Sequence, residues 1–418
     1  MRVRRALLLA LAAVAPAAGF SADPEALLAA VTHAPAVEAA RRRIDAAQAR
    51  LSATGRLADP EVEAMGSRVN GGPAGDDRSM WELNVRQPLP RRGERAADRD
   101  RATAAISMAE AEFAFVAGEA AAEVAVALAE AEGARARAAL IDTQQRRLGA
   151  VLASLDARLA AGASVRLADR LTLQTRAAAL ELSLEEARRT AADAEAAARS
   201  RLSLAPDAPL PVLSMPDPAS IRAQESPGVA LAEARAAEAS AMGRVARAGA
   251  APMTSVGLRL ERERGAAGSQ DTIGVAFASD LPFRARDYAR AGGRAAEAER
   301  AAARADAESA RQRVTNALGR AERAERLAET ARRLAKETQL RLEAEHDALN
   351  RSVSVGAASG MAGESTVLHA VDILDRTTET QLRIIEAETT ARISRAELWR
   401  HVAAPRLLRL AAASPPSP

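Results

Sequence analysis

Two aspartates, Asp372 and Asp375, are the residues whose type and spacing most suggest chemistry. At positions i and i+3 they share one face of a helix. Repeated around an oligomer, that face would form a ring of carboxylates, which favours cations and narrows an opening. The alternative is that acids early in a helix complement its dipole and stay solvated. Spacing alone favours this second interpretation.

Other candidates for catalysis or metal binding are sparse. The chain has no cysteine and four histidines, which stand far apart and in no ligand spacing: His33, His346, His369 and His401. We find no HExxH, GxSxG, GxGxxG or Walker motif. We therefore predict no enzyme activity, no cofactor and no metal site. Without cysteine we also expect no disulfides and no lipid anchor.

The amino-terminal segment predicts export. Three arginines precede an apolar run from Ala6 to Ala15 and then small residues, the pattern of a secretory signal peptide over residues 1–22. Once Arg2, Arg4 and Arg5 are removed with it, 55 basic and 55 acidic residues remain. A formally neutral chain with interspersed charges argues against a nucleic-acid partner.

Two long proline-free stretches, residues 91–205 and 283–404, dominate the chain and are rich in Ala, Arg, Glu and Leu. These residue types favour helix, and the helix breaker is absent. We predict a helical hairpin in each stretch, over about 91–204 and 284–402. A Pro-rich connector at 206–226 separates them, one helix from Asp23 to Gly55 precedes them, and residues 405–418 form a disordered tail.

Short strands are expected before each helical hairpin. Apolar residues alternate at Trp81, Leu83 and Val85, which predicts a β-hairpin over about 61–87. The plan then repeats with a constant offset of 192 residues, at the following pairs: Pro35 and Pro227, Pro60 and Pro252, Pro90 and Pro282. We infer an internal duplication, with repeats at 23–205 and 227–404 and a second β-hairpin over about 253–280.

Four strands on a helical rod would leave two open sheet edges. In an exported chain, an outer membrane offers closure into a β-barrel, which needs no apolar helix. Such barrels begin at about eight strands, so identical copies must contribute the remainder. The alternative is a small periplasmic β-domain that never meets lipid.

This order of elements resembles the TolC family of outer membrane efflux proteins over essentially the whole mature chain. The matching segments are Gln87-Pro-Leu-Pro90, the tip Arg158-Leu-Ala-Ala-Gly-Ala-Ser164, and Val371-Asp-Ile-Leu-Asp-Arg-Thr-Thr378. The resemblance implies a mainly α fold with a small β part, and a homotrimer whose twelve strands form one barrel in outer-membrane lipid. It also implies a periplasmic α-helical barrel that docks to a periplasmic adaptor and an inner-membrane transporter.

The resemblance also assigns candidate sites. The family's pore-constricting aspartates match Asp372 and Asp375, and Asp169 is a weaker counterpart after the first tip. Small residues at the two tips are candidates for adaptor contact, with ordinary turn chemistry as the alternative: Gly162, Ser164, Gly363 and Ser365. The arginine and tyrosine that latch the best-known member have no match, since this chain has Leu368 and Gly363 there.

The sequence therefore predicts an exit duct of a tripartite efflux system, located in the outer membrane of a Gram-negative-type bacterium with most of the chain in the periplasm. An inner-membrane partner of the resistance-nodulation-division (RND) type, including its heavy-metal branch, is favoured. The alternative function is a periplasmic coiled-coil adaptor or structural interaction protein without a pore, which would stay in the soluble periplasmic fraction.

Overall fold

A computed structural model describes residues 24–69, 78–160, 167–265, 268–280, 283–358 and 365–413. The fold is mainly helical with a small antiparallel sheet, as the sequence predicts. The signal segment lies outside the described residues. Within the described part of the chain, no helix is both long and apolar enough to span a membrane.

The long helices lie where proline is absent. The first hairpin consists of α3 (Glu94–Ala160) and α4 (Leu167–Arg201), and the second of α6 (Ala285–Ala358) and α7 (Ser365–Ala396). The 67 residues of α3 extend about 100 Å at the usual rise of about 1.5 Å per residue. The helix begins after Pro90, where the backbone N–H of Arg91 donates to the Glu94 carboxylate at 2.6 Å. That bond satisfies a donor near the helix start.

The shorter elements complete each repeat. Helices α1 (Pro24–Val31) and α2 (Pro35–Ala53) precede the first strands, and α5 (Pro227–Ala248) precedes the second pair. The 3-10 turns η2 (Pro218–Ser220) and η3 (Ala223–Glu225) lie in the Pro-rich connector, and η4 (Glu397–His401) follows α7. Helix α8 (Ala404–Ala413) ends the described chain.

Two details of the prediction were wrong. The expected single helix from Asp23 to Gly55 is broken at Thr32–Ala34, because Pro35 has no N–H and disfavours helical geometry in the residue before it. The expected disordered tail from residue 405 is helical as far as Ala413. Leu407 is fully buried with Gly118 of α3 beside it, and α8 also contacts α1, so packing holds this segment in place.

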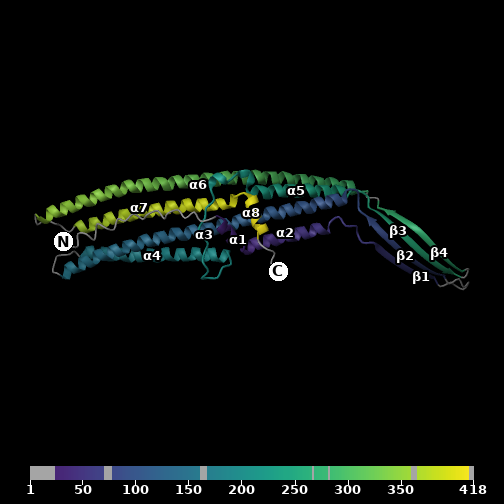
Figure 1. The fold of residues 1–418 in the computed structure, drawn as a ribbon, viewed down its shortest axis with the longest axis horizontal. Coiled ribbons are helices and arrows are strands. Elements are labelled where there is room, and N and C mark those ends of the chain that lie inside the picture. Colours follow the sequence, from purple (N-terminus) through teal and green to yellow (C-terminus); the bar gives the residue numbers. More distant parts are fainter. Residues whose placement is uncertain are drawn as a thin grey trace. The chain divides into compact units, whose positions relative to one another are not determined.

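The four strands form one antiparallel sheet in chain order (Figure 1). They are β1 (Glu61–Val69), β2 (Arg78–Leu89), β3 (Thr254–Gly265) and β4 (Gly268–Ser279). The two copies of the duplication meet where β2 pairs with β3, with Leu83 opposite Leu260. Strands β1 and β4 are the free edges of this single-chain sheet.

The compact units of the structure do not coincide with the repeats. One unit comprises the described parts of residues 1–38, 116–226 and 312–418, and the other those of 39–115 and 227–311. The second unit contains the whole sheet with the helix ends that adjoin it in the chain. Each unit therefore combines segments of both copies.

Alanine builds most of the core. In the first unit the buried residues include Ala117, Ala121 and Ala125 on α3, and small side chains let neighbouring helices approach closely. A Cβ added to Gly133 of α3 would collide with the side chain of Thr389 on α7. In the second unit, Ala111 of α3 packs with Leu231 and Ala234 of α5.

Candidate functional site

The two predicted aspartates lie in the second and third turns of α7 and have different partners. Asp375 forms an ion pair with Arg176 of α4. Asp372 pairs within its own helix, with its carboxylate 2.8 Å from the guanidinium of Arg376. The i, i+3 face expected from the sequence exists, but each carboxylate has an arginine beside it.

The position of α7 against the first hairpin is set by apolar packing. Val371 is buried in a cluster with Leu148 and Leu155 of α3 and Leu173 of α4. Because Leu173 and Arg176 share a face of α4 at a spacing of three, the same docking that buries Val371 brings Arg176 to Asp375. The ion pair and the cluster therefore form one junction between α3, α4 and α7.

Burial dominates the electrostatics of Asp375. Its pKa is raised above the ordinary value of 3.8, because partial burial penalises the charged carboxylate more than Arg176 stabilises it. The nearby charge of Asp372 raises the pKa further. Asp375 is thus the member of the pair that binds a proton more readily than an ordinary aspartate.

The other predicted site residues are placed less completely. Asp169 lies in the first turn of α4, seven residues before Arg176, which is about 10 Å along the helix axis. Its neighbour Arg170 is fixed to Asp156 of α3 at 2.8 Å. Ser365 begins α7, whereas Gly162, Ser164 and Gly363 lie outside the described residues. The adaptor-contact role of the tips stays a prediction.

The sheet forms a second candidate site because its two faces differ. Register pairs Val256 with Phe277, Leu258 with Val275 and Leu260 with Ile273 on one face. We call this the apolar face, and most of its large side chains are exposed: Val275 is 80% and Phe277 70% accessible. An exposed apolar surface that crosses all four strands is unusual for a chain that stays in water.

The opposite face of the sheet, the charged face, carries ion pairs. Arg259 of β3 lies 3.0 Å from Glu82 of β2 and 3.2 Å from Glu261 of its own strand. Arg86 of β2 pairs with Glu63 of β1 at 2.5 Å. Charges that satisfy one another across strands suit a surface in contact with water.

The sequence prediction missed these cross-strand pairs, although a signal was present. The run Glu261-Arg-Glu-Arg264 alternates acid and base, and alternate residues of a strand point to opposite faces. Reading this run with the apolar alternation would have placed Glu261 and Arg262 on opposite faces. Among the described residues, no group of three acidic or histidine side chains is arranged to hold a metal ion.

No family model matches the chain, and no curated protein matches it. Solved structures do match. A membrane protein from Pseudomonas aeruginosa is 19% identical with a TM-score of 0.66, over 91% of this chain and 89% of that one. The outer membrane protein VceC from Vibrio cholerae is 17% identical with a TM-score of 0.65, over 91% and 95%. The MtrE outer membrane channel from Neisseria gonorrhoeae is 16% identical with a TM-score of 0.64, over 90% and 88%.

The chain has the TolC fold. At these identities the similarity is one of fold, and it covers both helical hairpins and the sheet. Arg176 lies near the start of α4, which follows the first tip, and Asp375 lies near the start of α7, which follows the second tip. Along the chain, the junction is therefore close to both tips. The junction belongs to the first compact unit and the sheet to the second.

Proposed function

We propose that this chain is the outer-membrane exit duct of a tripartite efflux system, and that it works as a homotrimer. The observation that carries the proposal is the sheet: one exposed apolar face, one ion-paired face and two free edges, on a chain with the TolC fold. Pairing β4 of one copy with β1 of the next removes both edges. The apolar faces then meet lipid and the charged faces line water.

The number of strands supports an oligomer. One chain supplies four strands, and single-chain outer-membrane barrels start at about eight. Three copies give twelve strands, the number that the family resemblance implies. The long helices continue from the same strand ends, so they form the periplasmic part of the tube, where they dock to a periplasmic adaptor and an inner-membrane transporter. The RND type is the transporter class that the sequence favours.

The junction at Asp375 is proposed to be the constriction of this duct. Here the described residues modify the sequence hypothesis, because Asp372 and Asp375 are each paired with an arginine. A ring of such pairs presents less net negative charge than free carboxylates. Asp169, two turns before Arg176 on α4, is the third proposed constriction residue. Solutes then pass when partners separate α7 from α4, and the chain itself catalyses no reaction.

The proposal is tested with the full-length protein purified from membranes. Cross-linking and mass measurement in detergent should give a trimer, and insertion into planar lipid bilayers should give discrete conductance steps. Cell fractionation distinguishes the duct from the alternative function. Recovery of the mature chain in the soluble periplasm, with no conductance, would support a coiled-coil adaptor or structural interaction protein and overturn the duct.

A further inference from the structure

Arginines gather at one end of the apolar face, where the strands reach the turns. Arg68 of β1 and Arg264 of β3 are both paired with Ser79 of β2. The three residues therefore lie in one row across the sheet. Arg262 lies in the next row and forms two hydrogen bonds to Asp271 of β4, at 2.7 and 2.8 Å. The described charges on this end of the face are therefore three basic and one acidic, a net positive patch.

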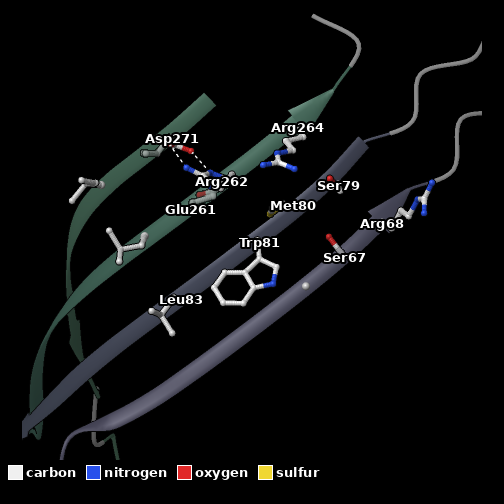
Figure 2. Close-up of a pocket in the computed structure, with 14 residues that line it drawn as sticks. Ser67, Arg68, Ser79, Met80, Trp81, Leu83, Glu261, Arg262, Arg264 and Asp271 are labelled. Carbon is white, nitrogen blue, oxygen red and sulfur yellow. Dashed lines mark hydrogen bonds and ion pairs between the residues drawn. The ribbon is translucent and has the colours of Figure 1, made fainter. Parts of the chain in front are cut away.

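The patch borders a hollow of about 700 Å³ lined by Arg68, Ser79, Trp81 and Arg264 among others (Figure 2). Trp81 pairs with Arg262 across β2 and β3 and is 58% exposed. Beyond this row the face continues as apolar residues, beginning with Leu83 opposite Leu260. A tryptophan between an apolar band and a charged rim is typical of a membrane–water interface.

On β3, the strand period keeps acids off the apolar face, and the described acid on this end of the face is Asp271 of β4. Glu261 and Glu263 alternate with Arg262 and Arg264, so on β3 the bases lie on the apolar face and the acids on the charged face. A lipid-facing arginine is costly near the middle of the bilayer and inexpensive at the interface. The placement of all three arginines in the two rows nearest the turns therefore fits contact with head groups.

If the proposed function holds, the order of elements along the chain determines which leaflet of the outer membrane the arginine patch reaches. The helices join the strands at the ends opposite the turns, because β2 leads into α3 and β4 into α6. The helices are periplasmic in that proposal, so the turns and the arginine patch reach the outer leaflet.

We propose that this patch binds the phosphate groups of the outer-leaflet glycolipid, lipid A. Arginine is well suited to phosphate because its planar group donates two parallel hydrogen bonds. Arg68 and Arg264 lie on strands separated by β2, a spacing of about 10 Å. Basic groups that far apart match a head group with a phosphate at each end of a disaccharide better than a phospholipid with one phosphate.

The test uses the full chain with Trp399→Phe, so that Trp81 is the fluorescent tryptophan, since the sequence holds two. The protein is inserted into phosphatidylcholine vesicles, and Trp81 emission is followed as lipid A is added. Parallel titrations use lipid A stripped of its phosphates and phosphatidylglycerol at equal mole fraction. Arg264→Glu is compared with Arg78→Glu, a matched charge reversal at the same end of the charged face.

Intact lipid A should shift Trp81 emission, and Arg264→Glu should weaken this response at least about fivefold, the effect of one charge near a membrane surface, whereas Arg78→Glu should not. Equal responses to lipid A with and without phosphates, or to phosphatidylglycerol, would overturn the assignment. So would equal effects of the two variants. If these results come with normal conductance, the inference fails and the duct stands. A chain with both native tryptophans that neither inserts nor conducts overturns both.

Discussion

The carboxylate of Asp375 on α7 contacts the guanidinium of Arg176 on α4, whereas Asp372, one turn earlier, pairs with Arg376 of its own helix. The two acids of the same motif are therefore not equivalent. One joins two helices of different repeats and the other stabilises only its own helix. In the proposed duct, separation of α4 from α7 must break the contact of Asp375 and can leave that of Asp372 intact.

Arg176→Gln should loosen this junction. The change leaves the partly buried Asp375 without its cation, and we expect a loss of stability on the order of 1 kcal/mol, as for a partly exposed pair. Spontaneous opening should rise accordingly, measured as single-channel open probability in planar bilayers. Arg376→Gln is the matched control, because it removes only an i, i+4 pair worth about 0.5 kcal/mol or less. Equal effects of the two variants would contradict the special role of Asp375.

The junction should also respond to acid. The pKa of Asp375 is raised above 3.8 in the packed junction, and separation of α7 from α4 exposes the carboxylate and returns its pKa toward that ordinary value. A proton therefore binds the closed form more tightly than the open form, so protonation favours closure. Open probability should fall as pH drops through the raised pKa toward 3.8.

Asp375→Asn checks this assignment, because the amide removes the titration and the cost of a buried charge. In this variant the pH dependence of open probability should be absent, while thermal stability at pH 7 is unchanged or higher. Single-channel recording across the acid range and thermal denaturation in detergent measure the two properties. A pH profile that the substitution leaves unaltered would refute the role of Asp375.

Close approach of α3 and α7 should make Gly133 intolerant of a side chain. A Cβ there would meet the Thr389 side chain, so Gly133→Ala should cost about 1–3 kcal/mol through overpacking. At Gly149 of the same helix, no described atom outside its own stretch of helix lies within 4 Å of the place a Cβ would take. Gly149→Ala should therefore stabilise the helix by up to about 1 kcal/mol. Thermal denaturation in detergent compares them, and stabilisation by both changes would mean that α3 and α7 do not approach as described.

The two faces of β4 should differ in their tolerance of charge. Val275 lies on the apolar face and Ala276 on the charged face, one residue apart and so at nearly the same depth. Val275→Arg should cost about 2–4 kcal/mol in the membrane-inserted state and reduce the amount of assembled trimer. Ala276→Arg should cost much less. Urea unfolding from lipid vesicles measures both, and equal tolerance would argue that the apolar face does not meet lipid.

His401 should make the chain sensitive to mild acid. Burial, followed by the charges of Arg400, Arg313 and Arg320, lowers its pKa from 6.5 to about 4. The unfolded chain then takes up a proton before the folded one, so stability falls as pH drops from 6.5 to about 4, by at most about 3 kcal/mol. His401→Gln should flatten the pH dependence of the melting temperature in this window. A variant that keeps the wild-type slope would show that other groups cause it.

Much of the fold could be predicted because it depends on local features. Proline positions mark the helix ends, and the offset repeat places both strand pairs. The tail was missed although its sequence carries a local signal, since Pro405 lies in the first turn of α8 and Leu, Arg and Ala follow it. The burial of Leu407 depends in addition on distant packing. The pairing of Asp375 was missed because it also depends on distant packing. Its partner Arg176 lies in the other repeat, and only the docking of Val371 on Leu173 brings the two together.

The division of the chain into units has a consequence for biogenesis. Helix α1 contacts α8, and their Leu27 and Leu407 are fully buried in the same unit. Helix α1 must therefore wait for α8 before this part of the core can close. In the proposed exported protein, this part of the core should therefore be the last of its unit to form, after the cluster of Ile141 with Leu184 within the first hairpin.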